Sequence, residues 1–343
     1  MQTFDLLYRQ RNFPRIRPDW LALRHEPALL PGLPVIDTHH HFWDQETAPY
    51  HADDLLADLG GGHAVVATVL VECQARYRAD GPEHLRPVGE TGFAVAQAER
   101  AARRGVNICQ GIVGWADLQS GAQVEEVLLA HAEAGRGRFR GIRCHGAWSD
   151  DPALAGPAGG PPRHLVLQPA FQAGVKVLTR LGLSLDLWLY HTQLADALQL
   201  AQDCPDTPIV LNHAGGPLGV GPFEGRRAEV FDAWRDDIRR LARCGNVSIK
   251  LGGLGMPRIG FPFAAGDRPA SSETLADAWR PYVETCIEAF GAERCMFESN
   301  FPVDKGMCSY TVLWNAFKRL ASGCSATQKA ALFHGTAARF YRL

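Results

Sequence analysis

Residues 35–43 constrain the fold and the chemistry of this chain more than any other stretch. An apolar pair runs into Asp37 and Thr38, and three consecutive histidines follow. In an extended strand, residues two apart point to the same side and lie about 6.5–7 Å apart. His39 and His41 therefore aim two imidazoles at one point, as is needed to hold a divalent cation or to bracket a polar reactant. Solvated histidines at a strand end are the alternative, which the clustering disfavours.

From residue 33 onward, apolar runs of strand length alternate with longer amphipathic segments. The runs lie at 33–38, 64–71, 107–115, 139–144, 183–190, 208–211, 246–251 and 294–298. Helices are expected at 86–104, 122–134, 192–203, 228–243, 274–290, 311–321 and 326–341, the last after a good N-cap residue, Ser325. Eight strands alternating with helices predict an α/β fold, a (β/α)8 TIM barrel over residues 33–343. Residues 1–32 are expected to form an N-terminal arm packed on this barrel.

The loops expected after the strands are long and rich in glycine and proline. They lie at 146–162, 214–225 and 252–272, on the side where a barrel places its active site. A doubly wound open sheet is the architectural alternative, and it requires a G-x-G-x-x-G turn after the first strand. The glycine cluster at 215–221 has a different spacing and contains a proline, so we discount a nucleotide site.

Polar residues recur where the apolar runs end. These residues are His39, His41, Glu72, Arg143, His145, His191, Asn212, His213, Lys250, Glu298 and Asn300. Each of them alone is compatible with a structural role. In a barrel, however, the ends of all the strands converge on one face, so the set predicts a single polar site.

Charge and composition exclude several classes of function. The formal net charge is −2 and there is no basic stripe, so we expect no nucleic-acid partner. No apolar run is long enough to cross a bilayer, and the N-terminus lacks the order of a signal peptide. Nine scattered cysteines without C-x-x-C spacing are typical of reduced thiols. We therefore expect a cytoplasmic protein that acts on a small molecule, with the oligomeric state left open.

Four motifs together resemble the amidohydrolase superfamily. They read DTHHHFW at 37–43, FRGIR at 139–143, NHAG at 212–215 and FESNFP at 297–302. The most similar branch is the amidohydrolase-2 group, which includes lactonases and decarboxylases related to aminocarboxymuconate semialdehyde decarboxylase. The resemblance spans residue 33 to the C-terminus, is strongly specific for the superfamily, and implies a (β/α)8 barrel with its site at the strand C-termini.

The resemblance also implies roles for particular residues. His39 and His41 match the first-strand metal pair, and His191 matches the fifth-strand ligand. His213 matches the sixth-strand histidine that assists proton transfer, and Arg143 matches an arginine that holds a substrate carboxylate. The divalent metal implied is zinc or manganese.

One departure from the family pattern lies in the eighth-strand motif, where Asn300 replaces the usual aspartate. A neutral amide cannot act as a general base and is a poorer metal ligand than a carboxylate. Either the role has moved to Glu298 or Asp304, or the site works without metal, as in some members of the lactonase branch. We also expect Lys250 and Glu298, costly inside a barrel when unpaired, to approach each other, or Glu298 to reach a metal.

The leading hypothesis is an enzyme, a hydrolase that opens a lactone, or a related cyclic or acyl ester, of a small carboxylated compound by activated water. The expected catalytic residues are His213, Asp304, Glu298 and Asn300. Arg143 would pair with the substrate carboxylate, beside His145, and Trp43 and Tyr190 would wall the pocket. The alternatives are a metal-dependent decarboxylase on the same scaffold and a catalytically degenerate barrel that binds a ligand.

Overall fold

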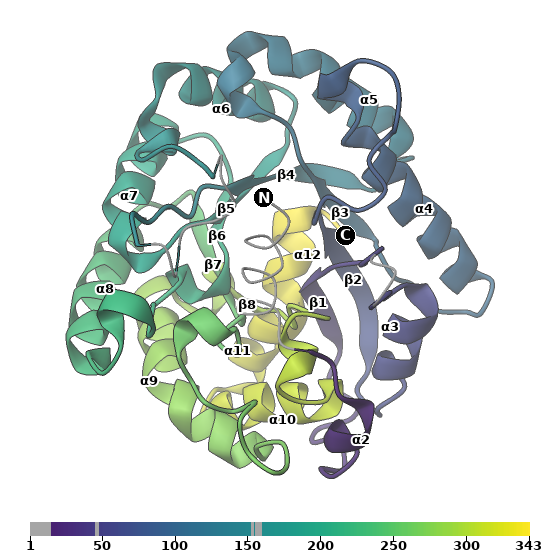
Figure 1. Cartoon of the computed structure of the whole chain (residues 1–343), viewed down its shortest axis with the longest axis vertical. Coiled ribbons are helices and arrows are strands. Elements are labelled where there is room, and N and C mark those ends of the chain that lie inside the picture. The colour runs from purple at the N-terminus through teal and green to yellow at the C-terminus, as the bar shows by residue number, and fades with distance from the viewer. Residues whose placement is uncertain (1–14, 45–47, 152–153, 155–159) are drawn as a thin grey trace.

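The molecule is built around a sheet of eight parallel strands, each paired with the next one along the chain. The structure is a computed structural model that describes residues 15–44, 48–151, 154 and 160–343. The strands are β1 (Val35–His40), β2 (Val65–Val71), β3 (Gly111–Gly114), β4 (Phe139–His145), β5 (Ser184–Trp188), β6 (Ile209–Leu211), β7 (Val247–Leu251) and β8 (Cys295–Phe297). Each of the eight apolar runs overlaps one of these strands, and the (β/α)8 barrel is confirmed (Figure 1).

Helices surround the strands, as the ring of ribbons in Figure 1 shows. They are α2 (Pro18–Leu21), α3 (Ala52–Leu59), α4 (Val88–Ala102), α5 (Glu125–Ala134), α6 (Pro169–Arg180), α7 (Leu194–Asp203), α8 (Arg227–Leu241), α9 (Ser272–Phe290), α10 (Tyr310–Leu320), α11 (Ala326–Ala330) and α12 (Thr336–Tyr341). Every expected helical segment contains helix, and Ser325 caps α11 as predicted. Within the described residues, none of these helices has the length and apolar character that crossing a bilayer requires.

The barrel closes between β1 and the segment that directly follows β8. The backbone N–H of His41 donates to the carbonyl of Phe301 over 2.7 Å, and the N–H of Asn300 donates to the carbonyl of His39 over 2.8 Å. His40 and Phe301 form a parallel bridge. This closure places the end of β8 beside the histidines of β1.

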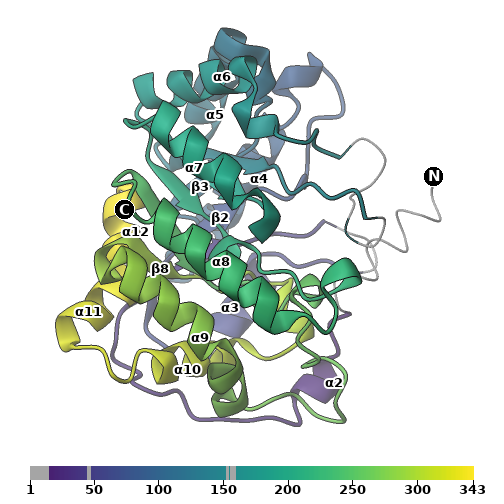
Figure 2. The same cartoon turned by 90° about the vertical axis from the view of Figure 1, so that its left-hand side faces the viewer.

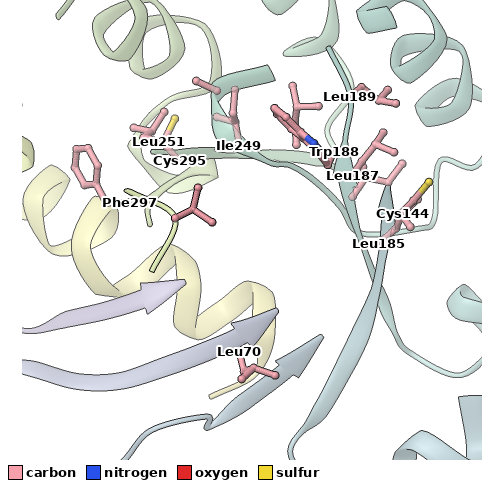
Figure 3. Close-up of a cluster of buried hydrophobic side chains, with 14 of the residues drawn as sticks. Leu70, Cys144, Leu185, Leu187, Trp188, Leu189, Ile249, Leu251, Cys295 and Phe297 are labelled. Carbon is pink, nitrogen blue, oxygen red and sulfur yellow. The ribbon is translucent and has the colours of Figure 1, made fainter. Parts of the chain in front are cut away.

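Side chains alternate between the two faces of each strand, so every second residue points into the barrel. Val210 and Met296 pack in the interior with Tyr341 of α12. Their strand neighbours pack outward against the helices. Figure 3 shows part of this outer layer, including Leu185, Leu187, Ile249, Leu251 and Phe297. The same alternation turns the residues between them, Asp186 and Lys250, toward the interior.

The C-terminal helix α12 covers the end of the barrel where the strands begin. Thr336 donates to the carbonyl of Ala292, just before β8, over 3.0 Å, and Arg342 donates to the carbonyl of Arg140, near the start of β4, over 3.2 Å. In the side view of Figure 2, α11 and α12 lie together at the left of the molecule. The polar strand ends therefore lie at the opposite end of the barrel.

Residues 15–32 run along the outside of the barrel. Arg17 donates to the carbonyl of Ala264 over 2.6 Å, and Trp20 donates to that of Gly266 over 2.9 Å. Lys318 of α10 donates to the carbonyls of Leu29 and Leu30. Residues 1–14 of the expected arm, and 152–153 and 155–159 of the expected loop 146–162, lie outside the described residues.

Candidate active site

The first two site residues, His39 and His41, come together at the end of β1. Their Nε2 atoms lie 3.2 Å apart, and both rings are buried. Nδ1 of His41 donates to the carbonyl of Val71 over 2.8 Å, which leaves its Nε2 as the acceptor. This contact assigns the proton of His39 to Nε2, from which it donates to His41, whereas Oε2 of Glu298, 2.9 Å from Nδ1 of His39, favours the other tautomer.

Asp37, the residue that opens the histidine motif, holds this end of the barrel in shape. Its Oδ1 accepts a hydrogen bond from the N–H of Ser299 over 2.9 Å, and its Oδ2 accepts one from the Tyr310 hydroxyl over 3.0 Å. Burial raises the pKa of Asp37 to about 6. Because Asp37 bonds to the segment after β8, it positions β1 and β8 rather than facing the site.

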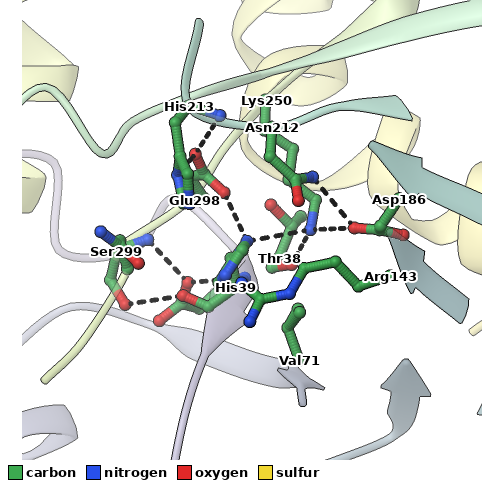
Figure 4. Close-up of polar contacts among 12 residues, drawn as sticks. Thr38, His39, Val71, Arg143, Asp186, Asn212, His213, Lys250, Glu298 and Ser299 are labelled. Atoms are coloured by element: carbon green, nitrogen blue, oxygen red, sulfur yellow. Dashed lines mark hydrogen bonds and ion pairs between the residues drawn. The ribbon is translucent and has the colours of Figure 1, made fainter. Parts of the chain in front are cut away.

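Glu298 and His213 form a carboxylate–imidazole pair next to His39 (Figure 4). Oε1 of Glu298 lies 2.7 Å from Nδ1 of His213 and 3.0 Å from its backbone N–H. The His213 ring packs 4.6 Å from the His39 ring and 4.7 Å from Trp188. Burial lowers the pKa of His213, so its ring is neutral at pH 7, with Nδ1–H toward Glu298 and Nε2 as a base.

Two consecutive glycines allow this pair to form. A Cβ on Gly253, whose φ is +63°, would lie 2.4 Å from Nδ1 of His213. A Cβ on Gly252 would lie 2.3 Å from the backbone oxygen of Glu298. The loop after β7 thus runs too close to both side chains for any larger residue.

Asn300, which stands where the family has aspartate, lies against Asp304. Its side-chain N–H donates to Oδ1 of Asp304 over 3.0 Å, and the N–H of Gly255 donates to Oδ2 over 3.3 Å. Burial raises the pKa of Asp304 to about 8, and the negative charge of Glu298 adds to the effect. Asn300 thereby orients a carboxyl group that keeps its proton near neutral pH.

Lys250 pairs with a residue that the sequence analysis missed. Its Nζ lies 2.7 Å from Oδ2 of Asp186, and both side chains are fully buried. The expected direct approach to Glu298 is not formed. Instead, Lys250 and Glu298 both lie near Nδ1 of His39, at 3.4 Å and 2.9 Å. The signal for Asp186 was its position as a charged residue within the apolar run at 183–190.

Arg143, the expected carboxylate clamp, already has a carboxylate partner. Its Nε donates to Oε1 of Glu72 over 2.8 Å, its guanidinium also donates to the Glu72 backbone carbonyl, and both side chains are buried. Figure 4 shows the guanidinium reaching toward His39. The positive charge of Arg143 is the second cause, after burial, that lowers the pKa of His41.

The remaining predicted pocket residues lie around the same strand ends. His145 is exposed to solvent at the end of β4, yet burial and then Arg143 hold its pKa well below the ordinary value. Tyr190 is buried and accepts a hydrogen bond from Arg258 over 2.7 Å. Trp43 is buried after β1, where its backbone pairs with Tyr50.

His191 lies outside the cluster formed by the other histidines. Its Nδ1 accepts from the backbone N–H of Leu218 over 3.3 Å, and its ring packs edge-on against Phe223. The proton of the neutral ring is therefore on Nε2. Its role as a metal ligand stays a prediction that this arrangement does not favour.

The donor set around His39 fits a divalent cation. Among the described residues, His39, His213 and Glu298 form the one group of three whose ligand-type atoms lie within 4.8 Å of one another. The 3.2 Å between the Nε2 atoms of His39 and His41 also matches the roughly 3.3 Å between two nitrogen ligands of a tetrahedral zinc ion. Oε2 of Glu298 is buried and accepts no hydrogen bond from the described residues. It lies 2.9 Å from Nδ1 of His39, on the side of the ring opposite Nε2.

Comparisons with known proteins agree with this architecture. The amidohydrolase family model matches residues 36–343. An uncharacterized protein of Sinorhizobium fredii, y4mH, is 36% identical over 90% of this chain and 98% of its own length. An L-fucono-1,5-lactonase of Burkholderia multivorans is 29% identical over 90% of this chain and 96% of its own. The crystal structure of an amidohydrolase from Burkholderia multivorans with bound zinc superposes with a TM-score of 0.69 and 27% identity, covering 90% of this chain and 99% of that one.

Proposed function

This chain belongs to the amidohydrolase family, and from that membership we propose that it hydrolyses a small lactone, opening the ring with water. The observation that carries the proposal is the pair formed by Glu298 and His213. A carboxylate that accepts the Nδ1 proton of an imidazole leaves Nε2 free to take a proton from water, as hydrolytic sites require. The lactonase of Burkholderia multivorans, at 29% identity, supports the same chemistry.

In this mechanism, His213 is the general base. Its Nε2 takes a proton from a water molecule as the water oxygen attacks the lactone carbonyl carbon. Glu298 is a positioning residue, because it fixes the ring through two hydrogen bonds to one oxygen and favours the imidazolium that forms.

Asp304 is the candidate acid for the second half of the reaction. When the bond between the carbonyl carbon and the ring oxygen breaks, the leaving oxygen needs a proton. A buried carboxyl group whose pKa is about 8 still carries one at neutral pH. Asn300 and Gly255 donate hydrogen bonds to Asp304 and hold it in place. Asn300, which stands at the family's aspartate position, therefore orients the proton donor and does not itself donate the proton.

His39 and His41 would hold a divalent metal through their Nε2 atoms, next to Glu298. When bound, such an ion acts as a Lewis acid that polarises the carbonyl. Without it, the Nε2–H of His39 is the hydrogen-bond donor available at this position.

The pairing of Arg143 supports a neutral lactone over a carboxylated one. A guanidinium that already donates to the Glu72 carboxylate, with both groups buried, carries little net charge toward a substrate. A carboxylated lactone would have to displace the Glu72 carboxylate from Arg143 and leave it without a partner. A hydroxyl-bearing ring, by contrast, needs only hydrogen-bond partners. The same pairing weakens the decarboxylase alternative, which requires a carboxylate clamp.

A substrate panel tests the proposal. Purified protein is assayed against neutral five- and six-membered sugar lactones and against lactones that carry a carboxylate, with proton release as the readout. We expect turnover of at least one neutral lactone and weaker turnover of its carboxylated counterpart. Turnover of carboxylated lactones alone would contradict the substrate class, and binding of lactones without turnover would contradict hydrolysis.

The pH dependence of kcat/KM is expected to show an alkaline limb that comes from Asp304. The acid form is the active one, so activity is retained below the raised pKa and is lost as the pH rises through about 8. The measurement is the pH profile with the spontaneous hydrolysis of the lactone subtracted. Asp304→Asn is expected to lower the rate and to remove this limb. A limb that persists unchanged in that variant would assign it to another group.

Replacing Gly253 with alanine is expected to lower kcat/KM roughly 10²-fold, because misplacing a catalytic group by about 1 Å has that effect. The added Cβ would meet the His213 ring 2.4 Å from Nδ1, and the positive φ disfavours any side chain. Gly245→Ala is the matched control, since a Cβ there meets nothing within 4 Å. Equal activities of the two variants would show that the glycine does not position His213.

A further inference from the structure

The ammonium group of Lys250 is fixed below His39 by three polar contacts. Its Nζ lies 2.7 Å from Asp186 and 2.8 Å from the carbonyl of Thr38, and the third contact is with Nδ1 of His39 at 3.4 Å. An ammonium group has three donors and no acceptor. Two of its protons are used by oxygen atoms, which leaves the third for Nδ1 of His39, and Figure 4 marks this contact with a dashed line.

A hydrogen-bond network around Asp186, inside the barrel, keeps the ammonium group of Lys250 in place. Asp186 accepts hydrogen bonds from the Tyr341 hydroxyl at 3.0 and 2.9 Å and from Asn212 at 3.1 Å. The ring of Tyr341 also lies 5.3 Å from Nζ of Lys250. Asp186, Lys250 and Tyr341 are all fully buried, so the position of Lys250 is set from below by helix α12.

The donor of Lys250 determines the direction of the whole hydrogen-bond chain above it. Lys250 donates to Nδ1 of His39, Nε2–H of His39 donates to Nε2 of His41, and Nδ1–H of His41 donates to Val71. In this arrangement, the lone pair of His39 Nε2 is replaced by a proton. A metal ion needs that lone pair, because it binds imidazole only through an unprotonated nitrogen.

Glu298 favours the opposite arrangement. Its Oε2 lies 2.9 Å from the same Nδ1 of His39 and accepts no hydrogen bond from the described residues. If the proton of His39 moves to Nδ1, Oε2 gains a donor and Nε2 gains its lone pair. A carboxylate at the outer nitrogen of a metal-bound histidine is the arrangement that orients such ligands.

We propose that Lys250 and Glu298 compete for Nδ1 of His39, and that Lys250, held by Asp186 and Tyr341, sets the affinity of the site for a divalent cation. With Lys250 donating, His39 carries its proton on Nε2 and donates to His41. With Glu298 accepting, His39 becomes a metal ligand. Lys250 is a positioning residue in this scheme, acting through His39. The inference concerns the binding of a metal and does not rest on the identity of the lactone.

Zinc binding to the full-length, metal-stripped protein tests the proposal by titration calorimetry. The variant is Lys250→Met with Asp186→Asn, which removes the ion pair together so that no buried charge is left alone. We expect zinc to bind about 10-fold or more tightly than to the unaltered protein, the usual scale of effects from groups that orient metal-bound histidines. Glu298→Gln is expected to weaken binding. Unchanged or weaker binding by the folded double variant would overturn the proposal.

A second readout follows the proton on His39 directly, by ¹⁵N NMR of the imidazole nitrogens. The unaltered protein is expected to show the Nε2–H form of His39, and the double variant the Nδ1–H form. The Nδ1–H form in the unaltered protein would overturn the proposal whatever the calorimetry shows.

A matched control is present in the same chain. Lys318 also donates to two backbone carbonyls and to Nδ1 of a buried histidine, His63, at 2.8 Å, but on the outside of the barrel. Lys318→Met is expected to leave zinc affinity unchanged. A gain equal to that of the Lys250 variant would attribute the effect to the loss of any lysine and would overturn the specific role of Lys250.

Discussion

Replacing His213 with asparagine is expected to lower kcat/KM for lactone hydrolysis by about 10²–10⁴-fold, the usual contribution of a general base. The asparagine amide retains a donor close to the position of Nδ1, which lies 2.7 Å from Glu298. It lacks the Nε2 that takes the proton from water. The fold of the site is therefore kept while its base is removed, and the loss is expected in kcat more than in KM.

The measurement is steady-state kinetics on the lactone that the substrate panel identifies, with thermal unfolding to verify the fold. His164→Asn is the matched control, because His164 also holds a carboxylate, Asp196, at 2.8 Å through Nδ1. Its side chain is 54% exposed, so its replacement is expected to leave kcat/KM unchanged. A folded His213→Asn protein with less than a tenfold loss would contradict the role of His213 as the base.

Replacing Lys250 alone with methionine is expected to lower the free energy of unfolding by about 3–5 kcal/mol, the range for removing one partner of a buried ion pair. Asp186 would keep its hydrogen bonds from Tyr341 and Asn212 but would lose the positive charge 2.7 Å away. Its carboxylate has no access to water in the barrel interior. The measurement is denaturant unfolding of the unaltered and variant proteins.

The double variant Lys250→Met with Asp186→Asn is expected to regain most of this loss, because neither residue is then a charge without a partner. An exposed pair provides the comparison. Arg180 contacts Glu125 at 2.7 Å, with side chains 57% and 42% exposed. Its replacement by methionine is expected to change the free energy of unfolding by about 1 kcal/mol or less. Equal losses for Arg180→Met and Lys250→Met would contradict the argument from burial.

The barrel could be predicted from the sequence because most of its strands carry apolar residues on both faces. The run at 64–71, for example, has Val69 and Val71 in the interior and Leu70 facing the helices, and it contains β2 as expected. The helices α3 and α6 were not predicted. Helix α3 has only eight residues, and α6 follows a glycine- and proline-rich loop that obscures its start at Pro169.

The convergence of His39, His41, His213 and Glu298 could also be predicted, since strand ends of a barrel meet at one face. The partners of the buried charges could not. Asp186 lies 155 residues from Tyr341, and which interior residue reaches Lys250 depends on distances across the barrel. Periodicity determines the face of a strand on which a residue lies and says nothing about its partner on a distant strand. The pairing of Arg143 with Glu72, 71 residues away, was missed for the same reason.

Tyr341, whose hydroxyl donates to Asp186, lies in the C-terminal helix α12, and this bears on the order in which the site forms during folding. During synthesis, Asp186 and Lys250 are made before helix α12, which spans Thr336–Tyr341. Until α12 is made, Asp186 lacks the hydrogen bonds that it accepts from the Tyr341 hydroxyl. The dry interior, and the order that it imposes on the histidines, is thus acquired in one of the last steps of folding.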